Sequence, residues 1–330
     1  MADQAQRRVD AAVAEVRRAV RTALAALPSP YRDAPLLVAC SGGADSLALA
    51  AAALTVRGAG EVHAAVVDHG LQEGSARQAA ATAELLTGMG AVASVHRVEV
   101  GGPGGTEAAA RRARYAALRA ARPHPAAPVL LGHTLDDQAE TVLLGLGRGS
   151  GARSIAGMRA WDPPWSRPLL GVRRAVTVAA CAALDLPVWD DPHNVDPRFT
   201  RVRLRHEVMP LLEDVLAGGV AAALARTAAQ LREDDDALDA LATALVAEAR
   251  DGDALRLEPL ATTLPAVRRR VLRAWLAASA VTTLTEVHLR AADVLAAHGP
   301  DRGGVALPGG LELVRERGRL LLRPVRWPSG

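Results

Sequence analysis

The sequence predicts an α/β protein, with a parallel sheet that has helices on both faces, followed by a small α+β C-terminal domain. Short apolar runs alternate with segments of helical periodicity between residues 36 and 146, which is typical of strands and helices that follow one another in a parallel sheet. The connections between them are short, as in other sheets of this kind. Residues 305–323 change to short strands separated by glycine-containing turns, which indicates a second sheet.

The predicted elements follow in chain order. Residues 1–27 place small apolar and charged residues at helical spacing and stop before Pro28, which predicts a leading helix. Strands are then expected at residues 36–40, 61–68, 91–100 and 129–132. Helices are expected between and after them at residues 46–57, 75–89, 106–122 and 134–146. Later helices are expected at residues 175–184, 198–216, 264–278 and 285–298, and later strands at residues 305–307, 311–315 and 319–323.

An alanine-rich helix is expected between two domains. Gly218-Gly219 precedes this helix and the acidic run Glu233–Asp236 follows it, and both changes of composition favour a domain boundary. We therefore expect one domain over residues 1–217 and a helical linker with a C-terminal domain over residues 218–330.

The composition disfavours several classes of protein. Half of the 330 residues are hydrophobic, yet no uncharged apolar run approaches the ~20 residues of a membrane-spanning helix. Arginines lie in the first twenty residues, where a signal peptide would be apolar. The two cysteines, Cys40 and Cys181, are too few for a disulfide framework or a cysteine-rich metal site. We expect a cytoplasmic protein with no membrane partner.

All 39 basic residues are arginines. A chain without lysine cannot form a lysine Schiff base or the Gly-Lys-Ser/Thr phosphate loop. The arginines gather in two clusters, Arg198, Arg201, Arg203 and Arg205, and Arg268, Arg269, Arg270 and Arg273. Such clusters can neutralise nucleic-acid phosphates, and they can equally be solvated helix faces. Both interpretations remain open at this point.

A glycine-rich loop follows the first predicted strand. It reads Ser41-Gly42-Gly43-Ala44-Asp45-Ser46 and lies at the crevice where open α/β sheets bind ligands. The glycines allow an anion to approach the backbone, the serines supply hydroxyl groups, and the N-terminus of the following helix favours negative charge. A carboxylate such as Asp45 beside phosphate makes chemical sense if Mg²⁺ bridges the two.

A second polar run follows the strand expected at residues 129–132. It reads Gly132-His133-Thr134-Leu135-Asp136-Asp137-Gln138-Ala139-Glu140-Thr141. Asp137 and Glu140 are three residues apart and share one face of the helix that begins near Thr134. Several acids and a histidine at the mouth of a nucleotide site are costly unless cations meet them. Asp136 is equally open to a structural role, as a helix cap or a solvated acid.

The glycine-rich loop resembles the pyrophosphatase loop of the N-type ATP pyrophosphatases, the PP-loop superfamily with a Rossmann-like fold. Val67-Asp68-His69-Gly70-Leu71 is similar to the segment that borders the adenosine in these proteins. The run Gly132–Thr141 looks like the signature of the tRNA(Ile)-lysidine synthetases within that superfamily. Other stretches match the same family, namely Leu143-Leu144, Arg148-Gly149-Ser150-Gly151, Glu107, Ala110-Arg111, Arg114-Tyr115, Leu118, Arg167-Pro168-Leu169-Leu170, Asp191-Pro192, Asn194 and residues 201–210. Val202 departs from the pattern, because many members have asparagine there.

The resemblance implies an ATP-dependent ligation of lysine to C2 of the wobble cytidine of a tRNA(Ile) with a CAU anticodon. ATP, used with Mg²⁺, would adenylate the C2 oxygen and release pyrophosphate, and the lysine ε-amine would then displace AMP. Residues 1–217 would be the PP-loop catalytic domain and residues 218–330 would bind the tRNA. The expected partners are this tRNA and free L-lysine, and a homodimer is left open.

The resemblance and the chemistry together suggest the site residues. The expected ATP-binding residues are Ser41, Gly42, Gly43, Ala44, Asp45, Ser46, Val67, Asp68 and His69. The expected catalytic residues are Asp45, Arg111, Arg114, His133, Asp137, Glu140 and Arg205. Asp137 and Glu140 are expected to hold lysine, Arg201 and Arg205 to bind tRNA, and Asp45 to hold the metal. For His133, contact with phosphate and contact with the base are both open.

Two alternative functions fit the sequence less well. Another PP-loop tRNA-modifying enzyme would carry out thiolation, which generally needs cysteines for sulfur transfer, or amide transfer, which needs a glutaminase partner or an N-terminal cysteine. Cys40 and Cys181 are isolated, and residue 2 is alanine. A non-catalytic, arginine-rich RNA-binding protein on the same fold is disfavoured because Asp45, Asp137 and Glu140 are all retained.

Overall fold

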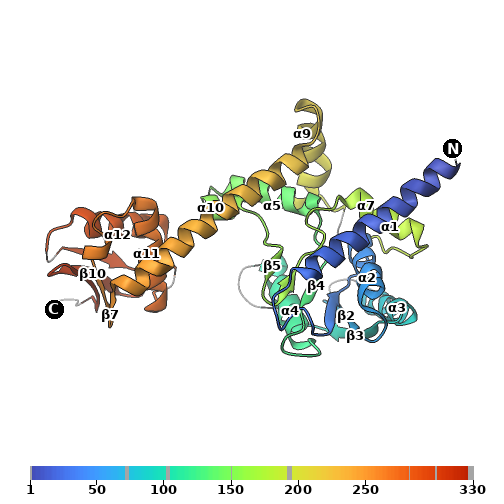
Figure 1. Cartoon of the computed structure of the whole chain (residues 1–330), viewed down its shortest axis with the longest axis horizontal. Coiled ribbons are helices and arrows are strands. Elements are labelled where there is room, and N and C mark those ends of the chain that lie inside the picture. The colour runs from blue at the N-terminus through green and yellow to red at the C-terminus, as the bar shows by residue number, and fades with distance from the viewer. Residues whose placement is uncertain are drawn as a thin grey trace. The chain divides into compact units, whose positions relative to one another are not determined.

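The computed structural model describes residues 2–70, 74–101, 105–149, 151–191, 195–281, 283–301 and 303–325, without the side chains of residues 2–9, 106 and 107. Leu71, Ser150, Pro192 and Asn194, which carry part of the family resemblance, lie outside the described residues, as does the side chain of Glu107. The chain divides into two compact units, residues 1–229 and 230–330 (Figure 1).

A six-stranded sheet forms the centre of the first unit. Its strands lie in the order β3 (Val92–Arg97), β2 (Val62–Asp68), β1 (Leu36–Ala39), β4 (Val129–Leu131), β6 (Trp165–Ser166) and β5 (Trp161–Asp162). From β3 to β6 the neighbours pair in parallel, and β5 pairs antiparallel with β6. The predicted parallel sheet is confirmed. The sequence did not predict β5 and β6, because both are two residues long and lie among prolines that mask any strand pattern.

Helices cover both faces of this sheet. One face packs against α1 (Ala2–Ala25), α2 (Ala44–Arg57), α3 (Ser75–Gly88) and α7 (Arg174–Ala183). The other face packs against α4 (Gly105–Ala120), whose Leu118 is fully buried. Leu36 and Val38 of β1 belong to the first core and Leu37 to the second, because successive strand residues point to opposite faces.

Glycines let the ends of β1 and β4 lie close to neighbouring helices, the loop after β1 to α3 and the end of β4 to the first turn of α2. Gly42 has φ +85°, a conformation that favours glycine, and a Cβ there would lie 2.7 Å from the Thr82 hydroxyl. A Cβ on Gly132, just after β4, would lie 3.0 Å from the backbone oxygen of Asp45. A larger residue at Gly42 would therefore push the loop away from α3, and one at Gly132 would push the end of β4 away from α2.

Helix α5 (Leu135–Arg148) begins with a capping box. The Thr134 backbone N–H donates to Asp137 Oδ2 at 2.8 Å, and the Asp137 N–H donates to Thr134 Oγ1 at 3.4 Å. This exchange satisfies amide groups that the first turn of a helix otherwise leaves without a partner. It also fixes the Asp137 side chain at the start of the helix. A short helix, α6 (Ala152–Ile155), follows α5.

The predicted helix at 198–216 is interrupted by one π turn. It comprises α8 (Thr200–Arg203), the π turn η2 (Leu204–Val208) and α9 (Met209–Val215). The Met209 N–H donates to the Leu204 oxygen, five residues earlier. Pro210 has no N–H to donate within the helix, and the π turn lies directly before it. Arg205 therefore stands in a widened turn of a kind that is frequent at functional sites.

Helix α10 (Val220–Ala249) runs from the first unit into the second. Its first amides are capped by Glu213, whose carboxylate accepts from the N–H of Val220 at 3.0 Å and of Ala221 at 3.1 Å. The acidic run Glu233–Asp236, interpreted from the sequence as the end of this helix, lies inside it. The sequence could not show that Arg270 pairs with Asp235 and Asp239 and so stabilises the helix there.

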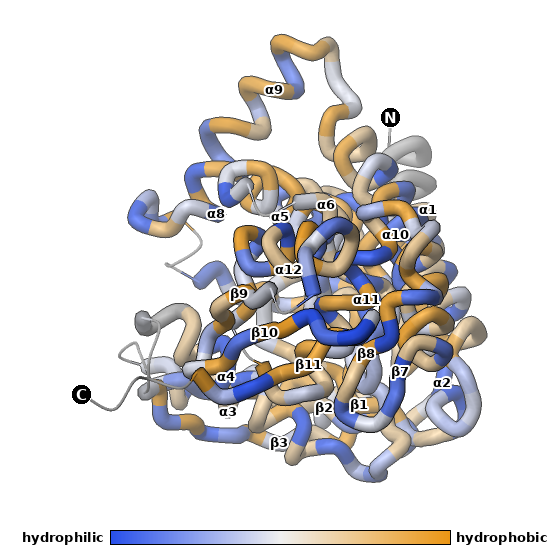
Figure 2. Tube along the Cα trace, turned by 90° about the vertical axis from the view of Figure 1, so that its left-hand side faces the viewer, coloured by the Kyte–Doolittle hydropathy of each residue, from blue (hydrophilic) through white to orange (hydrophobic). Residues whose placement is uncertain are grey.

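The second unit is an α+β fold. Its antiparallel sheet has the order β7 (Arg250–Asp251), β8 (Ala254–Arg256), β11 (Arg319–Pro324), β10 (Leu311–Glu316) and β9 (Gly304–Leu307). The sheet packs on η3 (Glu258–Leu260), α11 (Pro265–Ala278) and α12 (Glu286–His298), around Trp275. Hydrophobic and hydrophilic residues alternate along β10 and β11 (Figure 2), as in a sheet with one buried face. The predicted α+β domain is confirmed.

No single helix among the described residues is both long and apolar enough to cross a membrane. The bent pair Thr200–Val215 and Val220–Ala249 passes that test by length and composition alone.

Candidate active site

A cavity of about 320 Å³ lies at the carboxyl ends of β1 and β2. Five of the predicted ATP-binding residues line it, namely Ser41, Gly43, Val67, Asp68 and His69. The other four, Gly42, Ala44, Asp45 and Ser46, belong to the same loop and helix start but do not line the cavity. The cavity thus lies at the strand ends where α/β sheets bind ligands.

Hydrogen bonds hold the glycine-rich loop in one conformation. The Ser46 hydroxyl accepts from the Ser41 N–H at 3.1 Å and donates to the Gly43 oxygen at 2.9 Å. The Trp189 N–H donates to the Gly42 oxygen at 3.0 Å, and Trp189 lines the cavity. The loop is therefore ordered before any ligand enters.

Two groups at the cavity would be better satisfied with an anion present. Arg114 lines it and makes no ion pair among the described residues, and burial lowers the pKa of its guanidinium. The buried Nδ1 of His69 has no hydrogen-bond partner within the described part of the chain. Arg111 lies outside the cavity, with its guanidinium 4.8 Å from the centre of the Tyr115 ring. An anionic ligand is the natural counterpart of Arg114.

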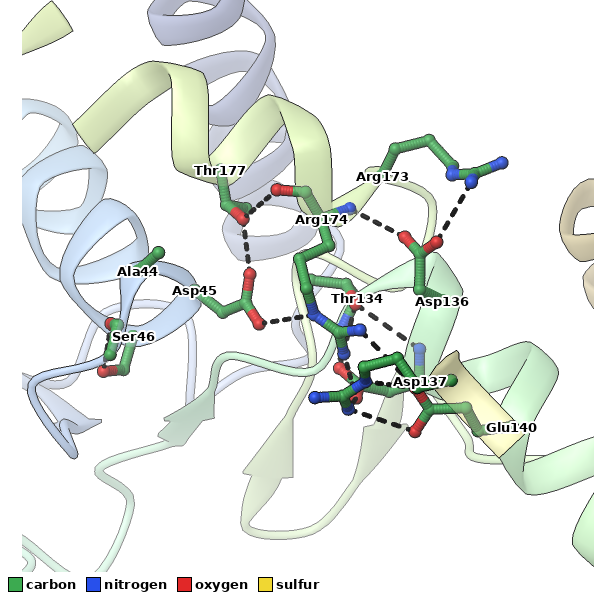
Figure 3. A network of polar contacts seen from close by, with 12 residues as sticks. Ala44, Asp45, Ser46, Thr134, Asp136, Asp137, Glu140, Arg173, Arg174 and Thr177 are labelled. Atoms are coloured by element: carbon green, nitrogen blue, oxygen red, sulfur yellow. Dashed lines mark hydrogen bonds and ion pairs between the residues drawn. The ribbon is translucent and has the colours of Figure 1, made fainter. Parts of the chain in front are cut away.

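Next to the loop, carboxylates and arginines form a cluster (Figure 3). The acid–arginine cluster consists of Asp45, Asp136, Asp137, Glu140, Arg173, Arg174, Arg201 and Arg205. Its acids come from the first turn of α2 and the first two turns of α5, and its arginines from the start of α7 and from the α8–η2 segment. Four segments that are distant in sequence thus meet at the loop.

Arg174 connects three of these acids. Its Nε lies 3.3 Å from Asp45 Oδ2, its Nη2 2.6 Å from Asp137 Oδ1, and its Nη1 3.4 Å from Glu140 Oε1. The Arg174 backbone N–H donates to Asp136 Oδ2 at 2.7 Å. The guanidinium therefore joins the glycine-rich loop to the acid pair on α5.

Arg205 and Arg201 both reach Glu140 from the α8–η2 segment. The Nε and Nη2 of Arg205 lie 2.8 Å and 3.2 Å from the two Glu140 oxygens. Arg201 Nη1 lies 3.8 Å from Glu140 Oε2. Arg203 instead pairs with the exposed Glu207. Arg201 and Arg205 thus face the site and Arg203 faces away from it.

Asp45 and Asp137 differ in their proton affinity. The Glu140 side chain beside them is only 1% exposed and lies among arginines that compensate its burial. Burial raises the pKa of Asp45, although Thr177 donates a hydrogen bond to it and Arg174 lies beside it. Burial also acts to raise the pKa of Asp137, but Arg174 and the Thr134 amide outweigh it and hold that pKa below its usual range. Asp137 is therefore ionised in the absence of any ligand.

His133 lies directly before Thr134, the N-cap of α5, and its imidazole is held neutral. Burial, aided by Arg114 and Arg167, lowers its pKa to about 3, against the opposing effect of Asp137. Its buried Nδ1 has no hydrogen-bond partner among the described residues. A neutral imidazole can accept a hydrogen bond at one ring nitrogen and donate one at the other.

A second, smaller cavity of about 170 Å³ borders the cluster. It is lined by Asp136, Glu140, Arg173, Arg174, Arg205, Met209, Pro210 and Glu213. At roughly 30 Å³ per liquid water molecule, this space suits a small polar solute. Its walls carry both charge signs, which suits a molecule that itself carries ammonium and carboxylate groups.

Arg174, Thr177 and Trp189 contact the site, although the sequence did not predict them as site residues. One signal for Arg174 was present, because Arg173 and Arg174 begin an alanine-rich helix, and a helix N-terminus disfavours positive charge unless acids compensate it. Thr177 and Trp189 carried no such signal. Their positions follow from the packing of α7 and of the segment after it against the loop.

Two family models match the chain. A PP-loop domain model matches residues 14–212, and a TilS substrate binding domain model matches residues 255–321. The chain is 60% identical over 292 residues to a tRNA(Ile)-lysidine synthase of Nocardia farcinica, covering 87% of this chain and 91% of that protein. It is 54% identical over 317 residues to the tRNA(Ile)-lysidine synthase of Rhodococcus erythropolis, covering 94% and 95%.

The chain belongs to the tRNA(Ile)-lysidine synthase family. The resemblance drawn from the sequence is thereby confirmed, and with it an ATP-using PP-loop enzyme of the ligase class. Among solved structures, the U34-tRNA thiolase NcsA from Methanococcus maripaludis superposes with a TM-score of 0.54, covering 68% of this chain and 80% of that one. At 18% identity, that likeness supports the fold alone.

Proposed function

We propose that the protein ligates free lysine to C2 of the wobble cytidine of a tRNA(Ile) with a CAU anticodon. In the first step the cytidine C2 oxygen attacks the α-phosphate of ATP and pyrophosphate leaves. In the second step the lysine ε-amine attacks C2, AMP leaves with the oxygen, and the amine gives up a proton. The products are lysidine in the tRNA, AMP and pyrophosphate.

One observation carries the proposal. The glycine-rich loop, the cavity beside it and the acid pair on α5 form one continuous site, because Arg174 bridges Asp45 to Asp137 and Glu140. A nucleotide site and a cation site in direct contact are what a ligase of this type needs, since its amine must meet an adenylated group.

For the nucleotide, the ends of β1 and β2 supply the pocket. We assign the ATP phosphates to Ser41 and Gly43, with Arg114 as counter-charge, and the adenosine to the Val67–His69 side of the cavity. Asp45 stands at the first turn of α2 and suits Mg²⁺, which binds through one or two carboxylates together with substrate phosphates. When bound, Mg²⁺ would neutralise charge on the phosphates.

For the amine, the acid pair supplies the binding charge. Lysine enters as an ammonium, and we assign that group to Asp137 and Glu140, beside the 170 Å³ cavity. Asp137 is already ionised and can hold the ammonium and orient it. Arg205, beside Glu140, can offset negative charge on the departing AMP. His133 stays neutral and can hydrogen-bond the cytosine ring.

For the tRNA, we assign contacts to both units. Arg201 and Arg205 are partly exposed next to the site and suit the phosphates near the wobble base. The second unit, which contains the region matched by the substrate binding domain model, would hold the body of the tRNA. We also propose a cytoplasmic location, and sedimentation equilibrium would decide between a monomer and a homodimer.

The proposal is tested by incubating the protein with ATP, Mg²⁺, radiolabelled lysine and tRNA(Ile) bearing a CAU anticodon. We expect label at the wobble cytidine and one AMP released for each lysine joined. The matched control is the same tRNA with uridine at the wobble position. Equal labelling of both tRNAs, or AMP release without labelling of either, would contradict the proposal. Sulfur incorporation is disfavoured because the chain has only two cysteines, both buried.

A further inference from the structure

The acid–arginine cluster is compensated in charge before any substrate enters. Within the described residues, its four carboxylates face the four guanidinium groups of Arg173, Arg174, Arg201 and Arg205. Both oxygens of the buried Glu140 are already in contact with arginines. If lysine binds here, as the proposed function has it, its ammonium must replace one of these cations.

Arg205 is poorly suited to leave. Two of its nitrogens contact the two Glu140 oxygens at 2.8 Å and 3.2 Å, and such two-point contacts are among the strongest that arginine makes. Arg201 is further away and also bonds Thr141, so its departure would free little of the acid pair.

Arg174 is well suited to leave. It contacts Asp137 through one nitrogen and Glu140 through another at 3.4 Å, and it retains a third acid, Asp45, on the opposite side (Figure 3). When it turns from the acid pair, the guanidinium therefore still has an anionic neighbour. Asp45 lies at the glycine-rich loop. The phosphates of a bound nucleotide carry more negative charge than the one Mg²⁺ assigned to Asp45 would neutralise, so they would still add net negative charge on that same side.

We infer that Arg174 is a positioning residue that occupies the ammonium subsite in the free protein and yields it to lysine when nucleotide is bound. The inference rests on the proposed function. Nucleotide stabilises the arrangement in which Arg174 has left Asp137 and Glu140, and lysine stabilises the same arrangement. Each ligand must therefore raise the affinity for the other by the same factor. The arginine also keeps the acid pair from being buried without a counter-charge while lysine is absent.

The test is calorimetric titration of L-lysine into the full-length protein, with and without α,β-methylene-ATP and MgCl₂. This nucleotide cannot be split between its α and β phosphates, so binding is measured without reaction. The wild type is compared with Arg174→Gln and with Arg203→Gln. The latter is the matched control, because Arg203 pairs with the exposed Glu207, faces away from the site and lines neither cavity. Thermal melts followed by circular dichroism verify that each variant folds.

For the wild type we expect the nucleotide to tighten lysine binding at least ~fivefold, the lower end of typical coupling. Arg174→Gln should bind lysine without nucleotide as tightly as the wild type does with it, and the nucleotide should then have less than a ~twofold effect. Arg203→Gln should behave as the wild type. Thr177→Val gives a second test, because it frees an Asp45 oxygen for Arg174 and should tighten lysine binding without nucleotide.

Full coupling in Arg174→Gln, or weaker lysine binding in it than in the wild type, would overturn the inference, because a merely structural arginine would give one of these results. Absence of lysine binding in every variant, with nucleotide binding intact, would overturn it as well. The labelled-lysine assay with wild-type protein is run in parallel. Coupling without incorporation into tRNA would contradict the proposed function and leave the role of Arg174 standing.

Discussion

Each unit of the molecule holds a cluster of arginines and carboxylates, and the two clusters serve different ends. In the second unit, Arg268 Nε lies 2.6 Å from Asp293 Oδ1, and Arg270 pairs with Asp235 and Asp239. All its arginines come from α11, and its acids come from α10 and α12. These contacts tie three neighbouring helices together. In the first unit the cluster arginines border the 170 Å³ cavity and reach the acids of the glycine-rich loop and of α5.

Arginine density alone does not identify a functional surface. The runs at residues 198–205 and 268–273 look alike in the sequence. Arg268 and Asp293 are both only 10% exposed, so they are each other's counter-charges rather than phosphate contacts. Arg205 is 27% exposed beside a cavity and shares its acids with Arg174. A functional cluster is recognised when several arginines share the same acids and border a cavity that a ligand can enter.

The largest effect is expected at Asp45, where the first cluster meets the loop. Asp45→Ala should lower ATP consumption at least ~100-fold, because it removes the carboxylate that we assign to charge management at the phosphates. The Tm should change little, since the side chain is partly exposed. Pyrophosphate release is the measurement. Asp136→Ala removes an acid of the same cluster that lies outside the loop. It should lower the rate of ATP consumption less than ~tenfold. Near wild-type ATP use by Asp45→Ala would contradict the assignment.

In the second unit, we expect that breaking the cluster of arginines and carboxylates lowers stability and leaves catalysis unchanged. Asp293→Ala leaves Arg268 and Arg269 without their shared acid and should lower the free energy of unfolding by about 3 kcal/mol, as for other broken buried pairs. Its kcat and its KM for lysine, per folded molecule, should stay within ~twofold of the wild type. Denaturant unfolding and steady-state kinetics measure the two quantities. A large change in kcat with unchanged stability would show that this cluster is functional after all.

In the first unit, the effect of removing an arginine should depend on whether its side chain faces the site. Arg205→Ala or Arg201→Ala should weaken tRNA modification about tenfold and flatten its dependence on salt, because each removes a cation that faces the site. Arg203→Ala should change it less than ~twofold, since Arg203 pairs with the exposed Glu207. Modification rates over a series of salt concentrations provide the measurement. Equal effects at all three positions would indicate a diffuse electrostatic surface instead of a directed site.

The smallest effect is expected from His133. Its pKa is about 3 in the folded protein, against 6.5 for an ordinary histidine. The unfolded chain therefore binds this proton first, so the stability contributed is complete above pH 6.5 and lost as the pH falls toward 3. His133→Asn should reduce the loss of stability between pH 7 and pH 5 by about 2 kcal/mol. His96→Asn on β3 is the control. Parallel pH profiles for the wild type and His133→Asn would contradict this.

Much of the fold could be predicted because its signals are local. β1 and β4 are short apolar runs, α5 has a capping box at Thr134, and α1 has an apolar face. The length of α10 could not be predicted, because Asp235 and Asp239 are stabilised by an arginine thirty residues later in the chain. β5 and β6 are too short to show a pattern.

The site residues also divide into those with a local sequence pattern and those positioned by distant contacts. Ser41, Asp45, Asp137 and Glu140 lie in two contiguous runs and could be recognised there. Arg174 could not be placed, because its partners are 34 to 129 residues away in the sequence. Only the packing of α7 against α2 brings its guanidinium between the loop and the acid pair.

We propose that Asp137 and Glu140 bind the amine while the glycine-rich loop binds the nucleotide. The most direct measurement is the KM for lysine and the KM for ATP of Glu140→Gln and Asp137→Asn, determined in the same tRNA modification assay. We predict that the KM for lysine rises at least ~tenfold while the KM for ATP changes less than ~twofold, because these amides remove charge only from the ammonium subsite. Parallel changes in both KM values, or no change in either, would contradict the claim.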